Sequence, residues 1–108
     1  MVEKVTIVYS KNFIEYLDDL VKILYFKEYF GFIESAEEYV SRIYDAAAER
    51  CQLDMYKIAP KNISFLGTYY IFYKSNKRTT WYIFFEKKET AILITGISNN
   101  HCEEAKEL

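Results

Sequence analysis

Apolar positions recur along this chain with two different periods, and the change between them divides it into a helical and a strand-rich part. Residues 3–9 are rich in β-branched side chains and predict a strand. Ser10 can cap a following helix by accepting a backbone N–H. The apolar stripe of that helix consists of Phe13, Leu17, Leu20, Val21 and Leu24. Gly31 is its expected end, because glycine adopts the left-handed C-cap conformation without steric cost.

A second helix is expected directly afterwards. Ser35 and Glu38 form the S-x-x-E pattern of a capping box at its start. Its buried stripe would consist of Ala36, Val40, Ile43, Ala47 and Cys51. We expect this helix to end near Asp54. The short glycine-containing connection between the helices indicates an antiparallel hairpin.

Strand periodicity takes over after Pro60. Three apolar runs of strand length follow, at 66–73, 79–85 and 91–97. The connections at 74–78 and 86–90 are short and polar, which predicts an antiparallel meander of three neighbouring strands.

The middle strand of this meander is apolar on both faces. One face carries Trp81, Ile83 and Phe85, and the other carries Tyr82 and Phe84. One face must pack on the helices, so the helical stripes should be buried there. The other is either a second covered face or an exposed aromatic surface.

These elements together predict one α+β domain over residues 1–108. Its order is a strand, a two-helix hairpin, the antiparallel meander and a last short helix, which Asn100 could cap with Glu103 three residues on.

The composition, 51% hydrophobic and 28% charged, is that of a globular chain. No run of about 18 apolar residues is present, so no transmembrane helix is expected. The N-terminus lacks the pattern of an export signal, so we expect a cytoplasmic protein with Cys51 and Cys102 as reduced thiols.

Charge is distributed unevenly along the chain. Residues 1–54 carry 6 Lys or Arg against 11 Asp or Glu, whereas residues 55–100 carry 7 against 2. A basic sheet half can mark a phosphate-binding face. The alternative is that hairpin turns collect lysines for solubility and to protect sheet edges from pairing.

Two residues near the strand ends are candidates for chemistry. His101 is the only histidine, and an imidazole can take up and release protons near neutral pH. Arg78 lies in the first hairpin turn with Lys74 and Lys77, where a guanidinium could bind a phosphate through two hydrogen bonds. For both sites the alternative is an ordinary solvated turn.

Other side chains are candidates for nucleic-acid binding. Lys57 and Lys61 flank Pro60, and they could either bind phosphate or belong to an ordinary solvated turn. Four tyrosines of the predicted sheet could stack on unpaired bases or simply pack between strands: Tyr69, Tyr70, Tyr73 and Tyr82. The sequence contains no phosphate-binding glycine loop, metal-ligand spacing, serine nucleophile elbow or dinucleotide fingerprint, so no cofactor or metal is expected.

The order of elements resembles the RelE/ParE superfamily of plasmid-stabilisation-like toxins in type II toxin–antitoxin systems. The resemblance is carried by residues 5–13, 36–43, Pro60 with 66–70, the aromatic strand 81–85, and 94–97. Ribosome-dependent members of this family are mRNA endonucleases, with basic residues on the sheet and a His or Tyr after the last strand. The resemblance also implies a cognate antitoxin as partner and mRNA or the ribosome as target.

The resemblance assigns roles to the candidates. The RNA's own 2′-hydroxyl would attack the phosphate, Arg78 and Lys74 would offset the growing negative charge, and His101 would act as general acid. The RNA-binding residues would be Lys57, Lys61, Lys74, Lys77 and Tyr82.

The sequence departs from the family in three ways. Residues 99–102 stand where an arginine or lysine often follows the last strand, and the chain is less basic overall than such toxins usually are. The third departure concerns another arginine. That arginine usually stands inside the third predicted strand beside the tyrosine that matches Tyr82, and Trp81 stands there instead. These departures leave open a non-catalytic ParE-like inhibitor of DNA gyrase, or an inactive protein-interaction module of the same fold. The meander itself predicts that Arg78 and His101 share one end of the sheet, because the start of a strand lies beside the end of its antiparallel neighbour.

Overall fold

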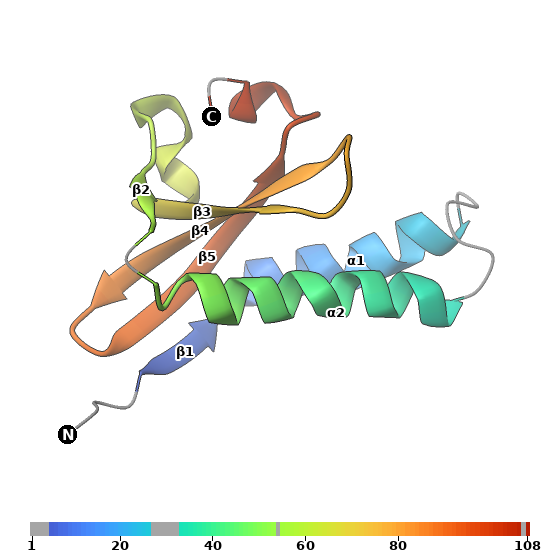
Figure 1. Cartoon of the computed structure of the whole chain (residues 1–108), viewed down its shortest axis with the longest axis horizontal. Coiled ribbons are helices and arrows are strands. Elements are labelled where there is room, and N and C mark those ends of the chain that lie inside the picture. The colour runs from blue at the N-terminus through green and yellow to red at the C-terminus, as the bar shows by residue number, and fades with distance from the viewer. Residues whose placement is uncertain (1–4, 27–32, 54, 107) are drawn as a thin grey trace.

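The structure, a computed structural model, describes residues 5–26, 33–53, 55–106 and 108. Its elements are β1 (Thr6–Tyr9), α1 (Lys11–Phe26), α2 (Ile33–Arg50), β2 (Lys57–Ile58), the 3₁₀ helix η1 (Lys61–Leu66), β3 (Tyr69–Lys74), β4 (Thr80–Lys88), β5 (Ala91–Asn99) and the 3₁₀ helix η2 (Glu103–Ala105). The fold is α+β, in the predicted order of strand, two helices and antiparallel strands (Figure 1).

The strands form one five-stranded mixed sheet with the order β1-β5-β4-β3-β2. The predicted meander of β3, β4 and β5 is confirmed, since both of its pairings are antiparallel. The first strand adds to the meander's last strand in parallel, with Thr6 opposite Ala91 and Tyr9 opposite Ile94. Figure 1 shows both helices side by side against one face of the sheet, with η1 and η2 on the other side.

The starts of the two helices differ in how well the sequence predicted them. The cap of α1 is confirmed, because the Ser10 hydroxyl accepts a hydrogen bond from the Phe13 backbone N–H at 3.2 Å. The predicted capping box of α2 is wrong. That helix begins at Ile33, which places Ser35 inside its first turn, and Glu38 pairs with Arg42 one turn on at 2.8 Å.

Helix and strand ends also shift from their predicted positions. The second helix ends at Arg50, before Asp54, while the predicted end of the first helix at Gly31 lies outside the described residues. The prediction missed β2 and η1, so the strand expected from residue 66 begins at Tyr69. The second hairpin is tighter than expected. β4 extends to Lys88 and β5 already begins at Ala91. Between them the chain turns at Glu89, which has a φ of 53°.

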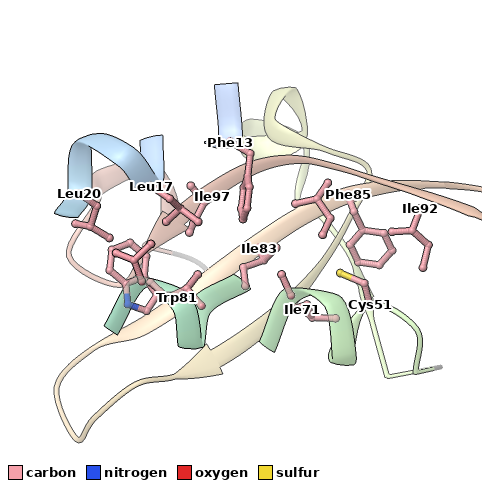
Figure 2. Close-up of a cluster of buried hydrophobic side chains, with 14 residues drawn as sticks. Phe13, Leu17, Leu20, Cys51, Ile71, Trp81, Ile83, Phe85, Ile92 and Ile97 are labelled. Atoms are coloured by element: carbon pink, nitrogen blue, oxygen red, sulfur yellow. The ribbon is translucent and has the colours of Figure 1, made fainter. Parts of the chain in front are cut away.

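The main core lies between the helices and one sheet face (Figure 2). Leu17 and Ile43 are fully buried there, and Leu20 and Val40 nearly so, as predicted, while Leu24 packs at the margin. The sheet contributes the residues of β4 that were predicted for this face, together with β3 and β5 side chains: Ile71, Trp81, Ile83, Phe85, Ile92, Ile94 and Ile97.

A bulge in β5 explains why Ile94 and Ile97 both face the helices although three positions separate them. Phe84 pairs with Gly96 but Phe85 pairs with Ile94, so Thr95 is the extra residue. Its hydroxyl donates a hydrogen bond to the Leu66 carbonyl at 2.5 Å. This contact fixes the end of η1 on the sheet.

The second sheet face is covered only in part. Its cluster consists of Ala59, Ile63, Tyr70, Phe84 and Ala105, with Leu66, Tyr82, Cys102 and Leu108 at its margin. The cover comes from η1 and η2 rather than from a long helix. Gly96 allows this close approach, because a Cβ there would lie 2.8 Å from the Leu66 carbonyl oxygen and Cβ.

A chain of hydrogen bonds ties α2 to the first hairpin turn. The Trp81 indole N–H donates to the Tyr39 hydroxyl at 2.9 Å, and that hydroxyl lies 2.8 Å from the Ser75 hydroxyl. Ser75 in turn donates to the Thr79 carbonyl from both its backbone N–H, at 3.1 Å, and its hydroxyl, at 3.3 Å. The end of the sheet that holds this turn is thereby fixed against the helical layer.

Leu17→Ala should lower the free energy of unfolding by about 2–5 kcal/mol, because the side chain is fully buried among core residues and the change leaves a cavity. Urea unfolding followed by circular dichroism measures this. Leu53→Ala is the matched control, since Leu53 is 45% exposed and its truncation should change stability by no more than about 0.5 kcal/mol. Equal losses from the two variants would contradict this packing.

Candidate functional site

One end of the sheet brings the first hairpin turn against the segment that follows β5, and we call this end the rim. Trp81 at the start of β4 pairs with Asn99 at the end of β5. The next residue, Asn100, accepts a hydrogen bond from the Thr80 N–H at 2.9 Å and donates one to the Arg78 carbonyl at 3.0 Å. The predicted meeting of the Arg78 and His101 segments is therefore found. The predicted helix-capping role of Asn100 is wrong, since η2 starts after Cys102.

His101 lies on the helix side of the rim. Its Nε2 is 3.3 Å from the Thr79 hydroxyl, and its backbone N–H donates to the Asn99 side-chain oxygen at 2.8 Å. The residue lines a cavity of about 440 Å³, which we call the rim hollow. Its walls are Leu20, Ile23, Leu24, Tyr39, Asn76, Thr79, Trp81, Asn99 and His101.

Arg78 is held at the rim through its backbone. Its N–H donates to the side-chain oxygen of Asn76 at 2.8 Å, and its side chain is exposed. The residue is not among those that line the rim hollow. The structure thus places the backbones of the two predicted catalytic residues together, while only His101 contributes to this cavity.

A second cavity, of about 320 Å³, opens on the sheet face opposite the helices, and we call it the sheet-face hollow. Its walls are Lys57, Tyr70, Phe72, Lys74, Thr80, Tyr82 and Leu108. Three predicted RNA-binding residues, Lys57, Lys74 and Tyr82, therefore converge there from three strands. The other two, Lys61 and Lys77, are exposed but do not line this hollow.

The four candidate tyrosines do not form one surface. Tyr69 and Tyr73 are partly buried against the helix-side core, which favours the alternative that they pack within the fold. Tyr70 is buried at the floor of the sheet-face hollow, and burial, together with its neighbour Tyr82, raises the pKa of its hydroxyl. Only Tyr82 is half-exposed on this face, with its ring centroid 6.0 Å from that of Tyr70.

A third cavity was not predicted from the sequence. It follows the edge of β3, has a volume of about 320 Å³, and is lined by Glu49, Arg50, Leu53, Met55, Ile71 and Phe72. We call it the edge groove. The short β2 pairs only with Tyr69 and Tyr70, so no described strand pairs with the remainder of β3 on the edge that faces away from β4. Apolar residues in the polar stretch after α2, Leu53 and Met55, were the sequence signal for it.

The described part of the chain contains neither a cluster of metal ligands nor a membrane-spanning helix. Within it, no group of three or more His, Cys, Asp or Glu side chains could hold a metal ion. None of its helices has the length and apolar character needed to cross a membrane.

In comparisons with known proteins, no family model, no curated protein and no solved structure matches the chain.

The two cysteines are free, as predicted, but differ in environment. Cys51 is fully buried in the main core, and burial raises the pKa of its thiol to about 12. Cys102 is half-buried beside the rim, with its sulfur 3.5 Å from the side-chain oxygen of Asn99.

At pH 8 a disulfide reagent should therefore modify one thiol of the folded protein, that of Cys102. Cys51 should react only after unfolding, because the thiolate is the nucleophile and burial keeps this thiol protonated. The measurement is the count of reactive thiols before and after addition of denaturant. Cys102→Ser should abolish the native reaction. Two thiols reacting equally fast in the folded wild type would contradict the assignment.

Proposed function

We propose that the chain is the toxin component of a type II toxin–antitoxin system and that it acts on RNA. The toxin role extends the resemblance in the order of elements, and the single observation that supports action on RNA is the convergence of Lys57, Lys74 and Tyr82 on the sheet-face hollow. These residues lie on β2, β3 and β4, so the fold brings them together from distant parts of the sequence.

The chemistry of this hollow suits a single nucleic-acid strand. Lys57 and Lys74 supply positive charge for two phosphates, while the half-exposed Tyr82 ring offers a face on which an unpaired base can stack. Alanine substitution of such stacking aromatics typically costs about 1–3 kcal/mol per base. A duplex keeps its bases paired and hidden, so the hollow favours a single strand over a duplex.

Cleavage would take place at the rim. The RNA's 2′-hydroxyl would attack the adjacent phosphate, with the exposed Arg78 side chain offsetting the developing charge. His101 would donate a proton to the leaving oxygen. The Thr79 hydroxyl, 3.3 Å from Nε2, would orient this imidazole. Lys74 lies at the end of β3, next to the same turn, and its ammonium would add further charge.

A second candidate is a non-catalytic inhibitor of the same fold, directed at DNA gyrase or another protein. The observation that favours it is the position of His101, which lines the helix-side cavity and not the hollow of Lys74 and Tyr82. A protein target would then be bound through surface and charge without proton transfer.

Both candidates call for an antitoxin, and the edge groove is the surface that best fits one. Leu53, Met55 and Phe72 are 45%, 78% and 49% exposed along a strand edge without a described neighbour. An extended peptide could add to this edge through its backbone and place apolar side chains in the groove. Arg50 already binds the Phe72 carbonyl at 2.6 Å, which limits such pairing to the positions around it.

Induced expression of the wild-type chain in bacteria should arrest growth. Under the nuclease hypothesis, His101→Ala and Arg78→Ala should each relieve the arrest, because they remove the general acid and the phosphate-binding cation. Growth curves and cleavage of cellular mRNA are the measurements. Lys22→Ala is the matched control, since Lys22 is an exposed cation on α1 that lines none of the three cavities.

The outcomes separate the two candidates. Arrest that persists in both folded variants without mRNA cleavage would exclude the nuclease and leave the non-catalytic inhibitor. A wild-type chain that neither arrests growth nor binds RNA would overturn the proposed function altogether.

A further inference from the structure

We propose that the rim hollow is a binding pocket for a nucleobase with two carbonyl acceptors, and specifically for uracil. As the specificity pocket of a toxin, this inference rests on the proposed function. As a binding site it depends only on the cavity between α1, α2 and the rim.

One part of the pocket wall is apolar. Leu20, Ile23 and Leu24 of α1 line it on one side, and Trp81 of β4 lines it as well. Its volume of about 440 Å³ falls in the range of cavities that hold small ligands, which are mostly apolar with a few placed polar groups. A planar ring of nucleobase size fits such walls.

The polar part of the pocket wall contains two asparagine side chains, Asn76 and Asn99, whose oxygens are held by backbone N–H groups. The side-chain oxygen of Asn76 accepts the backbone N–H groups of Arg78 and Thr79, at 2.8 and 2.9 Å. The side-chain oxygen of Asn99 accepts the backbone N–H of His101 at 2.8 Å. Only an amide oxygen can accept these bonds, so the orientation of both side chains is decided.

This orientation determines what each asparagine can offer a ligand. Because each oxygen is bound to the backbone, the group that each asparagine has left for a ligand is its NH₂, which donates and cannot accept. A ligand with carbonyl oxygens would satisfy two such donors. Uracil carries two carbonyl oxygens. Cytosine has an amino group in place of the second one, and that amino group would meet a donor and not an acceptor.

Charge in the pocket argues against a phosphate as its occupant. Of the described residues that line it, none is Lys, Arg, Asp or Glu, and His101 is the only titratable group besides the Tyr39 phenol. A phosphate there would lose water without gaining a permanent cation. A neutral base avoids this cost, while its phosphate can remain outside at the exposed Arg78.

Trp81 is the only tryptophan and lines the pocket, so its fluorescence reports binding directly. Titration of the purified chain with uridine monophosphate, excited at the red edge of indole absorption, should give a saturable change. Cytidine monophosphate should bind about tenfold more weakly. One hydrogen bond is lost, and the amino group of cytosine faces an asparagine NH₂ group, which is also a donor. Adenosine monophosphate should also bind more weakly, since adenine has no carbonyl oxygen and presents an amino group.

Asn76→Asp and Asn99→Asp are the decisive variants. An aspartate keeps the oxygen that caps the backbone N–H groups but removes the NH₂ donor, so the fold should survive while the uridine response is lost. Asn12→Asp is the matched control, because Asn12 is exposed on α1 and does not line the pocket. It should bind uridine monophosphate as the wild type does.

Thermal unfolding of each variant shows whether it is folded. If an aspartate variant is destabilised, the comparison of uridine with cytidine on the wild type alone decides the question. No saturable response to uridine monophosphate, an equal response to all three nucleotides, or unchanged binding in folded aspartate variants would each overturn the inference. RNA binding or growth arrest without uridine selectivity leaves the proposed function standing. Uridine selectivity without RNA binding and without growth arrest would support the pocket as a binding site and would exclude the toxin role.

Discussion

The fold depends on one constraint, which is that β4 is apolar on both faces and lies at the centre of the sheet. Trp81, Ile83 and Phe85 need one cover, and Phe84 with Tyr82 needs another. An uncovered apolar strand would leave a large patch in water. The two helices supply the first cover and bury their residues almost completely. The second comes from η1 and η2, which are short and leave part of the face open.

The incomplete second cover is what creates the candidate interface. Where η1 and η2 stop, Tyr82 stays half-exposed between Lys57 and Lys74. The rim is set by different contacts, since the hydrogen bonds from Trp81 through Tyr39 to Ser75 hold the hairpin turn against the helical layer. The two cavities therefore lie on opposite faces of the same strands. A single RNA strand that passed over the rim could engage both.

The sequence predicted what depends on local patterns and missed what depends on distant contacts. The helical stripes, the meander and the two faces of β4 follow from periodicity, and the meeting of Arg78 with His101 follows from antiparallel geometry. The parallel pairing of β1 with β5 has no local signal. The capping box at Ser35 failed because α2 begins earlier. Tyr69 and Tyr73 looked like Tyr82 in sequence, and only the pairing register shows that they face the helices.

Chemical-shift mapping of the ¹⁵N-labelled chain during titration with a short single-stranded RNA tests the central claim most directly. The largest shifts should come from the residues of the sheet-face hollow, with Lys57, Lys74 and Tyr82 among them, and these shifts should fade with added salt. Little change is expected at Leu53 and Met55 in the edge groove. Shifts confined to that groove, or none at any RNA concentration, would contradict the claim that the open sheet face binds RNA.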